Sequence, residues 1–175
     1  MMEVDELLRV AREIVGKVTF AVSITNGADG APGARIVQPS PPSEAWTLRF
    51  MTDRRSRKVA ETEHCGRMTM LYQFDQDGAY VTLVGNARIN DSVETKRAIW
   101  NPASLKWHPG GPDDPNVVLV EFVTERIELW SSRHDVVPDP RHGLWAAAMT
   151  RNGTSWCVSE TRAIGDARAR ATAEP

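Results

Sequence analysis

The chain opens with a helical pattern of apolar residues and then changes to the two-residue period of strands. Apolar residues recur at helical spacing from Val4 to Val15, and Gly16 is expected to end this helix. From Val18 to Ile24 larger apolar residues alternate with Thr19, Ala21 and Ser23, which predicts a half-buried strand. The residues expected on its buried face are Val18, Phe20, Val22 and Ile24.

Further alternating segments predict a protein built mainly from strands. They cover Arg35–Gln38, Trp46–Met51, Met68–Phe74, Ala79–Ile89 and Val117–Trp130. Short helices are expected at about Ser56–Glu63 and Asp91–Trp100, and a final hairpin joins Leu144–Thr150 to Ser155–Val158. Six or more strands with two or three short helices indicate a small antiparallel barrel with flanking helices.

The pattern also suggests a division of the chain. We expect residues 1–135 to form the barrel domain and residues 136–161 to form a C-terminal extension that contains the possible hairpin. Residues 162–175 are rich in Ala, Arg and Glu and are expected to form a flexible tail.

Composition narrows the class of protein. The 175 residues carry 21 Lys and Arg against 23 Asp and Glu, a net charge of -2 that argues against a general nucleic-acid binder. No apolar run approaches the roughly 18 residues of a membrane helix, and the N-terminus lacks the pattern of a secretory signal. Two cysteines are too few for a disulfide framework. We therefore expect a cytoplasmic protein without a membrane partner.

The common catalytic and metal patterns are missing from the sequence. The four histidines share no short metal-ligand spacing, so we expect no metal site. There is no Gly-x-Ser-x-Gly motif and no glycine-rich phosphate loop before a helix. No residue stands out as a general acid, a general base or a nucleophile, and the catalytic residues stay unassigned.

The most informative segment runs from Thr52 to Lys58, where a strand ends and a helix begins near Ser56. A helix N-terminus offers unpaired N–H groups and partial positive charge, and four Arg and Lys side chains stand around this one. This combination favours a bound phosphate. The competing interpretation is a solvated basic turn. Arg35, in a neighbouring predicted strand, is a second candidate, although a lone arginine on a strand is usually a surface residue.

Three groups of residues resemble the pyridoxamine 5′-phosphate oxidase-like flavoproteins, and within them the general-stress-protein branch. The first is Arg35-Ile36-Val37. The second is Phe50-Met51-Thr52-Asp53 followed by Ser56-Arg57-Lys58, which is similar to the family's Phe-x-Thr-(Asn/Asp)-x-x-Ser-x-Lys element. The third contains Trp100, the Gly-Pro-Asp-Asp-Pro run at residues 111–115 and the Leu129-Trp130 pair.

The resemblance implies a six-stranded antiparallel Greek-key split barrel and a homodimer that holds FMN at the subunit interface. Arg57 and Lys58, helped by Ser56, would bind the FMN phosphate. The isoalloxazine ring would lie against Arg35, Ile36 and Val37, partly through their backbone groups. Thr52 and Asp53 would lie beside the ring or the ribityl chain.

Two features differ from the pyridoxamine phosphate oxidases themselves. The long strand after the basic turn reads Ala79-Tyr80-Val81-Thr82 where those enzymes carry a glutamine, and the chain lacks their C-terminal Arg-Leu-Xaa-Pro motif. We therefore expect a flavin-dependent oxidoreductase that acts on another small redox substrate. The alternative is a non-enzymatic carrier or stress sensor, since relatives of this barrel bind deazaflavin F420, haem or biliverdin.

Overall fold

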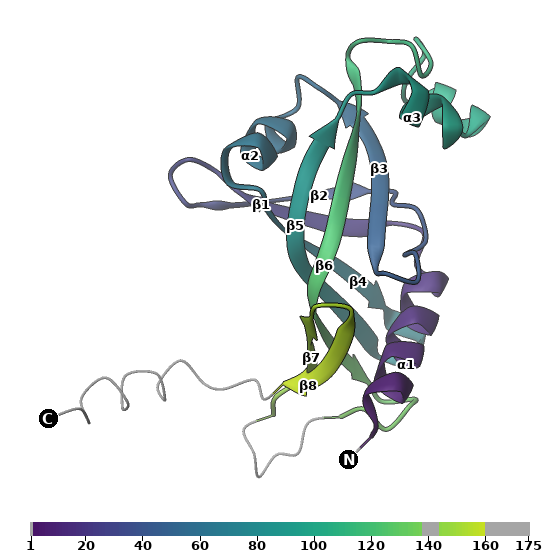
Figure 1. Cartoon of the computed structure of the whole chain (residues 1–175). Coiled ribbons are helices and arrows are strands. Elements are labelled where there is room, and N and C mark those ends of the chain that lie inside the picture. Colours follow the sequence, from purple (N-terminus) through teal and green to yellow (C-terminus); the bar gives the residue numbers. More distant parts are fainter. Residues whose placement is uncertain (1, 138–143, 160–175) are drawn as a thin grey trace, which may run out of the picture.

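The computed structural model describes residues 2–137 and 144–159. These residues form one antiparallel sheet with three α-helices around it (Figure 1). The helices are α1 (Val4–Lys17), α2 (Arg57–Cys65) and α3 (Val93–Ala98). The strands are β1 (Ala21–Asn26), β2 (Pro32–Val37), β3 (Thr47–Asp53), β4 (Arg67–Phe74), β5 (Ala79–Asn90), β6 (Val117–Ser131), β7 (Ala147–Asn152) and β8 (Ser155–Ser159).

The sheet has the order β2-β1-β4-β5-β6-β7-β8, and β3 pairs with β6 beside this path. The long strand β6 pairs with β5 on one side and with two shorter strands, β3 and β7, on the other. Its first half, Val117–Val123, pairs with β3, and residues 126–129 pair with β7. The mainly β class with flanking helices is thus confirmed. The described residues contain eight strands, two more than the six-stranded barrel that the family resemblance implies, because the C-terminal hairpin β7–β8 continues the sheet.

The alternating pattern correctly predicts which side chains of β3, β4 and β5 form the core. Leu48 and Phe50 on β3, Met70 on β4, and Val81 and Leu83 on β5 are all buried. These side chains pack with the apolar stripe of α1 in one hydrophobic cluster. Burial of this surface is the main stabilising contribution to such a fold.

The face of β1 was predicted wrongly. The buried residues of β1 are Ala21, Ser23 and Thr25, and not the more apolar residues between them. Val22 is half-buried on the opposite face, and Phe20 is 56% exposed just before the strand begins. Because side chains alternate along a strand, a polar group that is needed inside moves the apolar positions outside. Thr25 is such a group, since it bonds to a buried glutamate of α2.

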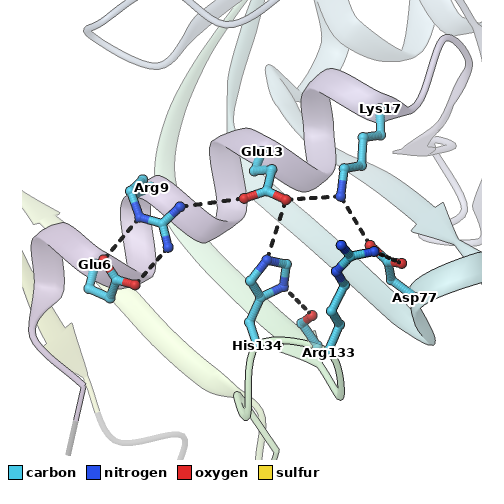
Figure 2. A network of polar contacts seen from close by, with 8 residues as sticks. Glu6, Arg9, Glu13, Lys17, Asp77, Arg133 and His134 are labelled. Atoms are coloured by element: carbon cyan, nitrogen blue, oxygen red, sulfur yellow. Dashed lines mark hydrogen bonds and ion pairs between the residues drawn. The ribbon is translucent and has the colours of Figure 1, made fainter.

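Helix α1 continues one residue past Gly16, where the sequence predicts its end. Lys17, the last residue of the helix, forms ion pairs with Glu13 at 2.9 Å and with Asp77 at 3.0 Å. Figure 2 shows how His134 and Arg133 join the same network, with His134 Nε2 3.4 Å from Glu13 and Arg133 3.1 Å from Asp77. The network ties α1 to the β4–β5 turn and to the end of β6. None of the described helices has the length and apolar content of a membrane span.

Candidate functional site

The predicted turn between β3 and α2 is present, and it leaves the start of the helix open. The backbone N–H of Ser56 donates to the carbonyl of Asp53 at 3.0 Å, which closes the turn. Ser56 occupies the N-cap position, but its side chain forms no capping hydrogen bond to the helix. A helix N-terminus has unpaired N–H donors that carry partial positive charge. These donors of α2 are therefore not occupied by the side chain that most often caps them.

Lys58 lies against this helix start. Its Nζ donates to Thr52 Oγ1 at 2.6 Å and lies 3.4 Å from Ser56 Oγ. Burial of the half-buried ammonium, followed by repulsion from Arg35, lowers the pKa of Lys58. A lowered lysine pKa means that the positive charge lacks full compensation. A bound anion would supply that compensation.

Arg35 and Arg57 meet at Glu61, a carboxylate that the sequence analysis missed. Arg35 Nη2 lies 2.6 Å from Glu61 Oε2, and Arg57 Nε lies 2.9 Å from Glu61 Oε1. Thr25 Oγ1 donates to Glu61 at 2.5 Å and accepts from Arg35 Nη1 at 2.5 Å. Burial alone would raise the pKa of Glu61, but the bonds from Thr25 and Arg35 outweigh it and lower the pKa. Glu61 is therefore ionised at neutral pH.

Gly33 on β2 provides the space for the two guanidinium groups. Its carbonyl accepts from Arg35 Nη1 at 2.7 Å. A Cβ at this position would lie 2.5 Å from Arg57 Nη2 and 3.1 Å from Arg35 Nη2. Because a contact under 3.0 Å forces a shift, the two arginines can only take this arrangement beside a residue without a side chain. The backbone of β2 thus forms one wall of the cluster.

The other two cations of the basic turn are engaged elsewhere. Arg55 binds both carboxylate oxygens of Asp53, at 2.9 and 2.6 Å. These hydrogen bonds lower the pKa of Asp53 to about 2. Arg54 pairs with Asp91 at 2.7 Å and donates to the carbonyl of Pro115. Of the four cations in this segment, Arg57 and Lys58 therefore remain at the helix start, and Arg35 joins them from β2.

The predicted ring-binding residues of β2 lie on two faces of the sheet. Val37 is buried in the hydrophobic core, so its side chain is not available to a ligand. Ile36 is 72% exposed on the opposite face, and its register partner is Val22 on β1. Only Arg35 extends toward α2 and joins the cation cluster. Arg35, Ile36 and Val37 do not act as one continuous side-chain surface.

The outer face of the sheet carries an open groove of about 560 Å³. It is lined by Leu71, Tyr80 and Trp130 together with polar residues of the β4–β5 turn. The rings of Tyr80 and Trp130 lie 6.3 Å apart. Leu71 is the register partner of Val22, which in turn pairs with Ile36. Val22 and Ile36 therefore lie on the same face of the sheet as Leu71 of the groove.

The loop at residues 107–116 adds a histidine to the surroundings of Lys58. Burial lowers the pKa of His108, and its charge interacts with both Asp53 and Lys58. The loop is held to the basic turn because the N–H of Arg54 donates to the carbonyl of Asn116 at 2.7 Å. It is held to α3 by the buried Lys96, which donates to the carbonyls of Asp114 and Val117.

The sequence pattern indicates one of the unpredicted site residues, Glu61, but not Thr25, Gly33 or His108. Arg57 and Glu61 have the i,i+4 spacing of a helical ion pair, so Glu61 could have been found from the predicted helix. Thr25, Gly33 and His108 come from other elements, and no local pattern connects them with α2. Among the residues that the structure describes, no three His, Cys, Asp or Glu side chains are grouped as a metal site.

The fold and this cluster define an antiparallel barrel protein with a cationic helix start at one end. Residues 6–161 match the family described as Pyridoxamine 5′-phosphate oxidase like. The chain belongs to this family, which confirms the resemblance that its motifs indicate.

The chain is also similar to general stress proteins. General stress protein 26 of Bacillus subtilis (strain 168) is 35% identical over 92 residues, which cover 51% of this chain and 65% of that protein. The chain thus spans less than two thirds of this curated relative. The solved structure of a protein related to general stress protein 26, from Clostridium acetobutylicum, matches with a TM-score of 0.67 at 20% identity. The match covers 74% of this chain and 91% of the Clostridium chain.

A second solved structure covers more of the chain. The pyridoxamine 5′-phosphate oxidase-related, FMN-binding protein of Nostoc punctiforme PCC 73102 has a TM-score of 0.66 at 16% identity. The match covers 93% of this chain and 98% of the Nostoc chain. At these identities the two solved structures show the shared split-barrel fold.

Proposed function

We propose that this protein binds FMN and acts as a flavin-dependent oxidoreductase. The observation that carries the proposal is the convergence of Arg35, Arg57 and Lys58 at the open N-terminus of α2. Together with Glu61 these groups have a net charge of two positive units. A phosphate monoester carries about 1.5 to 2 negative charges at neutral pH, so its charge matches the cluster. The donors of a helix start add directional hydrogen bonds to such a group.

Each part of the site would have a separate task. Lys58 and Arg57 would bind the phosphate directly, with the Ser56 hydroxyl and the helix N–H groups as further donors. Thr52 would hold the Lys58 ammonium in place through the 2.6 Å hydrogen bond. FMN, when bound, supplies the hydride or electron transfer that protein side chains cannot perform. The FMN-binding relative from Nostoc punctiforme supports this choice of cofactor.

The proposed substrate is a small redox molecule other than pyridoxamine phosphate. Ala79 and Val81 are buried in the core, while Tyr80 faces outward into the groove. This strand therefore offers a hydrophobic aromatic surface in the region where pyridoxamine phosphate oxidases carry a polar glutamine. An aromatic surface of this kind favours a planar, weakly polar substrate.

We also propose that the protein is a homodimer with the cofactor at the subunit interface. The outer sheet face carries apolar groups on neighbouring strands. They are exposed Ile36, half-buried Val22 and Leu71, and the Tyr80–Trp130 pair. Extended apolar surfaces on a folded protein usually mark interaction sites. A partner subunit on this face would cover the apolar residues that β1 and β2 direct outward. Sedimentation should give the mass of a dimer at micromolar concentration, and a monomer would contradict this part.

The first test is the absorption spectrum of the freshly purified protein, with mass spectrometry of the molecule that heat releases. We expect a flavin spectrum and released FMN. A Soret band would favour haem, and released F420 would favour the deazaflavin alternative. A colourless protein that takes up no added FMN would overturn the proposal.

The second test uses the double substitution Arg57→Ala and Lys58→Ala. Loss of two charge-assisted contacts should raise the Kd of FMN by about a hundredfold or more. The matched control is Arg54→Ala with Arg55→Ala, which removes two cations of the same turn that pair with Asp91 and Asp53. FMN binding should survive in the control.

If the wild-type protein binds FMN, oxidation of NAD(P)H by the holoprotein is the first activity to measure.

A further inference from the structure

Glu61 is an unusual neighbour for an anion site, because a buried carboxylate repels phosphate. Only 8% of its side chain is exposed, and both of its oxygens are used. Oε2 accepts from Arg35 and Thr25, and Oε1 accepts from Arg57. Removal of a carboxylate from water is costly unless all its bonds are satisfied. Both oxygens of Glu61 thus have partners, and their bonds join strands β1 and β2 to helix α2.

The geometry shows what Glu61 does for the two arginines. Arg57 is 70% exposed and has the conformational freedom of a surface side chain, but the 2.9 Å bond to Glu61 holds its Nε end. Its Nη2 comes close to Gly33, next to Nη2 of Arg35. Two guanidinium groups repel each other, and a negative charge bonded to both offsets this repulsion. Glu61 provides this charge.

We propose that Glu61 is a positioning residue that holds Arg35 and Arg57 together as a preformed clamp for the phosphate group of the cofactor. This inference rests on the proposed function. It assigns to Glu61 no contact with the phosphate itself. The carboxylate lowers the charge of the cluster by one unit but leaves two positive units in place. Glu61 also fixes the conformations of the two arginine side chains before the ligand binds. The side chains therefore lose less conformational entropy on binding.

The structure provides a matched control for this idea. Glu121 on β6 is equally buried and also binds two arginines, Arg49 at 3.1 Å and Arg88 at 2.7 Å. It lies on β6 between β3 and β5 and belongs to no helix start. The substitution Glu121→Gln therefore removes a buried carboxylate between two arginines without touching the proposed clamp.

The first experiment tests the clamp without any flavin. Nitrogen–proton spectra of the arginine side chains should show a protected Nε–H signal for Arg57 in the free wild-type protein. This signal should broaden or vanish in Glu61→Gln and persist in Glu121→Gln. The Arg49 and Arg88 signals should show the reverse. An unchanged Arg57 signal in Glu61→Gln would overturn the proposal.

The second experiment compares FMN with riboflavin, which lacks the phosphate. Glu61→Gln should raise the Kd of FMN by about tenfold to a hundredfold and leave the Kd of riboflavin unchanged. Glu61→Asp keeps the charge but is too short to reach both arginines, so it should also weaken FMN binding. Glu121→Gln should leave both constants within twofold of the wild-type values.

The outcomes separate the alternatives. Tighter FMN binding in Glu61→Gln would mean that the carboxylate only repels the ligand, and equal losses for FMN and riboflavin would mean that its role is general stability. Either result overturns the proposal.

If the wild-type protein binds no FMN, the proposed function fails, and inorganic phosphate becomes the probe. It should then shift the Arg57 Nε–H signal of the wild type and leave that of Glu61→Gln unmoved, and equal shifts in both proteins would overturn the role of Glu61.

Discussion

Two clusters in this protein have the same composition, one buried glutamate between two arginines, but different surroundings. Glu121 joins Arg49 and Arg88, and its side chain is 6% exposed. Glu61 joins Arg35 and Arg57, and its side chain is 8% exposed. The burial and the ion pairing of the two glutamates therefore do not distinguish the clusters.

Their construction distinguishes them. Glu121 is the direct register partner of Arg49 on β3 and of Arg88 on β5, so the sheet cluster follows from strand pairing alone. The Glu61 cluster combines a helix, two strands and the backbone of Gly33. It also lies beside Lys58 and an open helix start. The comparison shows that the surroundings decide whether a pair of arginines is a candidate anion site. At Glu61 the start of α2 and the third cation, Lys58, leave an excess of positive charge.

The largest difference is expected between Arg35→Ala and Arg49→Ala. Arg35 is mostly buried and also bonds to Thr25 and Gly33, so its loss should lower the free energy of unfolding by about 2 kcal/mol. It should weaken FMN binding by about a hundredfold. Arg49 is 43% exposed, and its loss should cost less than about 1 kcal/mol and leave FMN binding intact. Urea unfolding and flavin titration measure both quantities, and equal effects of the two substitutions would remove the distinction.

A smaller effect is expected from Gly33→Ala. The added methyl group would push apart the Arg35 and Arg57 guanidinium groups, and FMN affinity should fall by about tenfold. The displaced atoms are ends of flexible side chains, so the free energy of unfolding should change by less than about 1 kcal/mol. Ala34→Ser, on the exposed face of the same strand, is the control. A stable Gly33→Ala protein with full affinity would show that the clamp geometry is unimportant.

The smallest difference is expected in acid, where the two glutamates should behave alike. Both have a pKa below the ordinary value of 4.5: burial opposes ionisation in each, but bonds from Thr25 and Arg35 at Glu61 and from Arg88 at Glu121 outweigh it. Their stabilisation is thus fully present above pH 4.5 and is lost as the pH falls through the lowered pKa. Glu61→Gln and Glu121→Gln should each lack about 1 kcal/mol of wild-type stability at pH 7, and the difference should shrink below pH 4.5.

Unfolding curves at several pH values check this prediction. A deficit that persists undiminished in acid would show that the substitutions act through packing and not through charge. If only one of the two variants showed the pH dependence, the clusters would differ in their electrostatics as well as in their surroundings.

The sequence alone determined most of the local structure. Alternation predicted β3, β4, β5 and β6, and a serine before Arg57 and Lys58 predicted the start of α2 within one residue. Gly66, in the left-handed conformation, ends that helix two residues beyond the predicted end. These features depend on neighbours in the chain, and short-range patterns record them. The motifs at residues 50–58 and 111–115 likewise led to the correct family.

Only the tertiary structure decided which charges meet. Arg54 and Arg55 lie beside Arg57 in the chain, yet they pair with Asp91 and Asp53, whereas Arg35 crosses from β2 to join Arg57 at Glu61. The same contact reversed the prediction for β1, because Thr25 must face inward to reach Glu61, and the apolar residues of that strand then face outward. A one-residue change of face moves every apolar side chain of a strand to the other side of the sheet. The balance between burial of apolar groups and satisfaction of a buried carboxylate is set only when distant segments pack together.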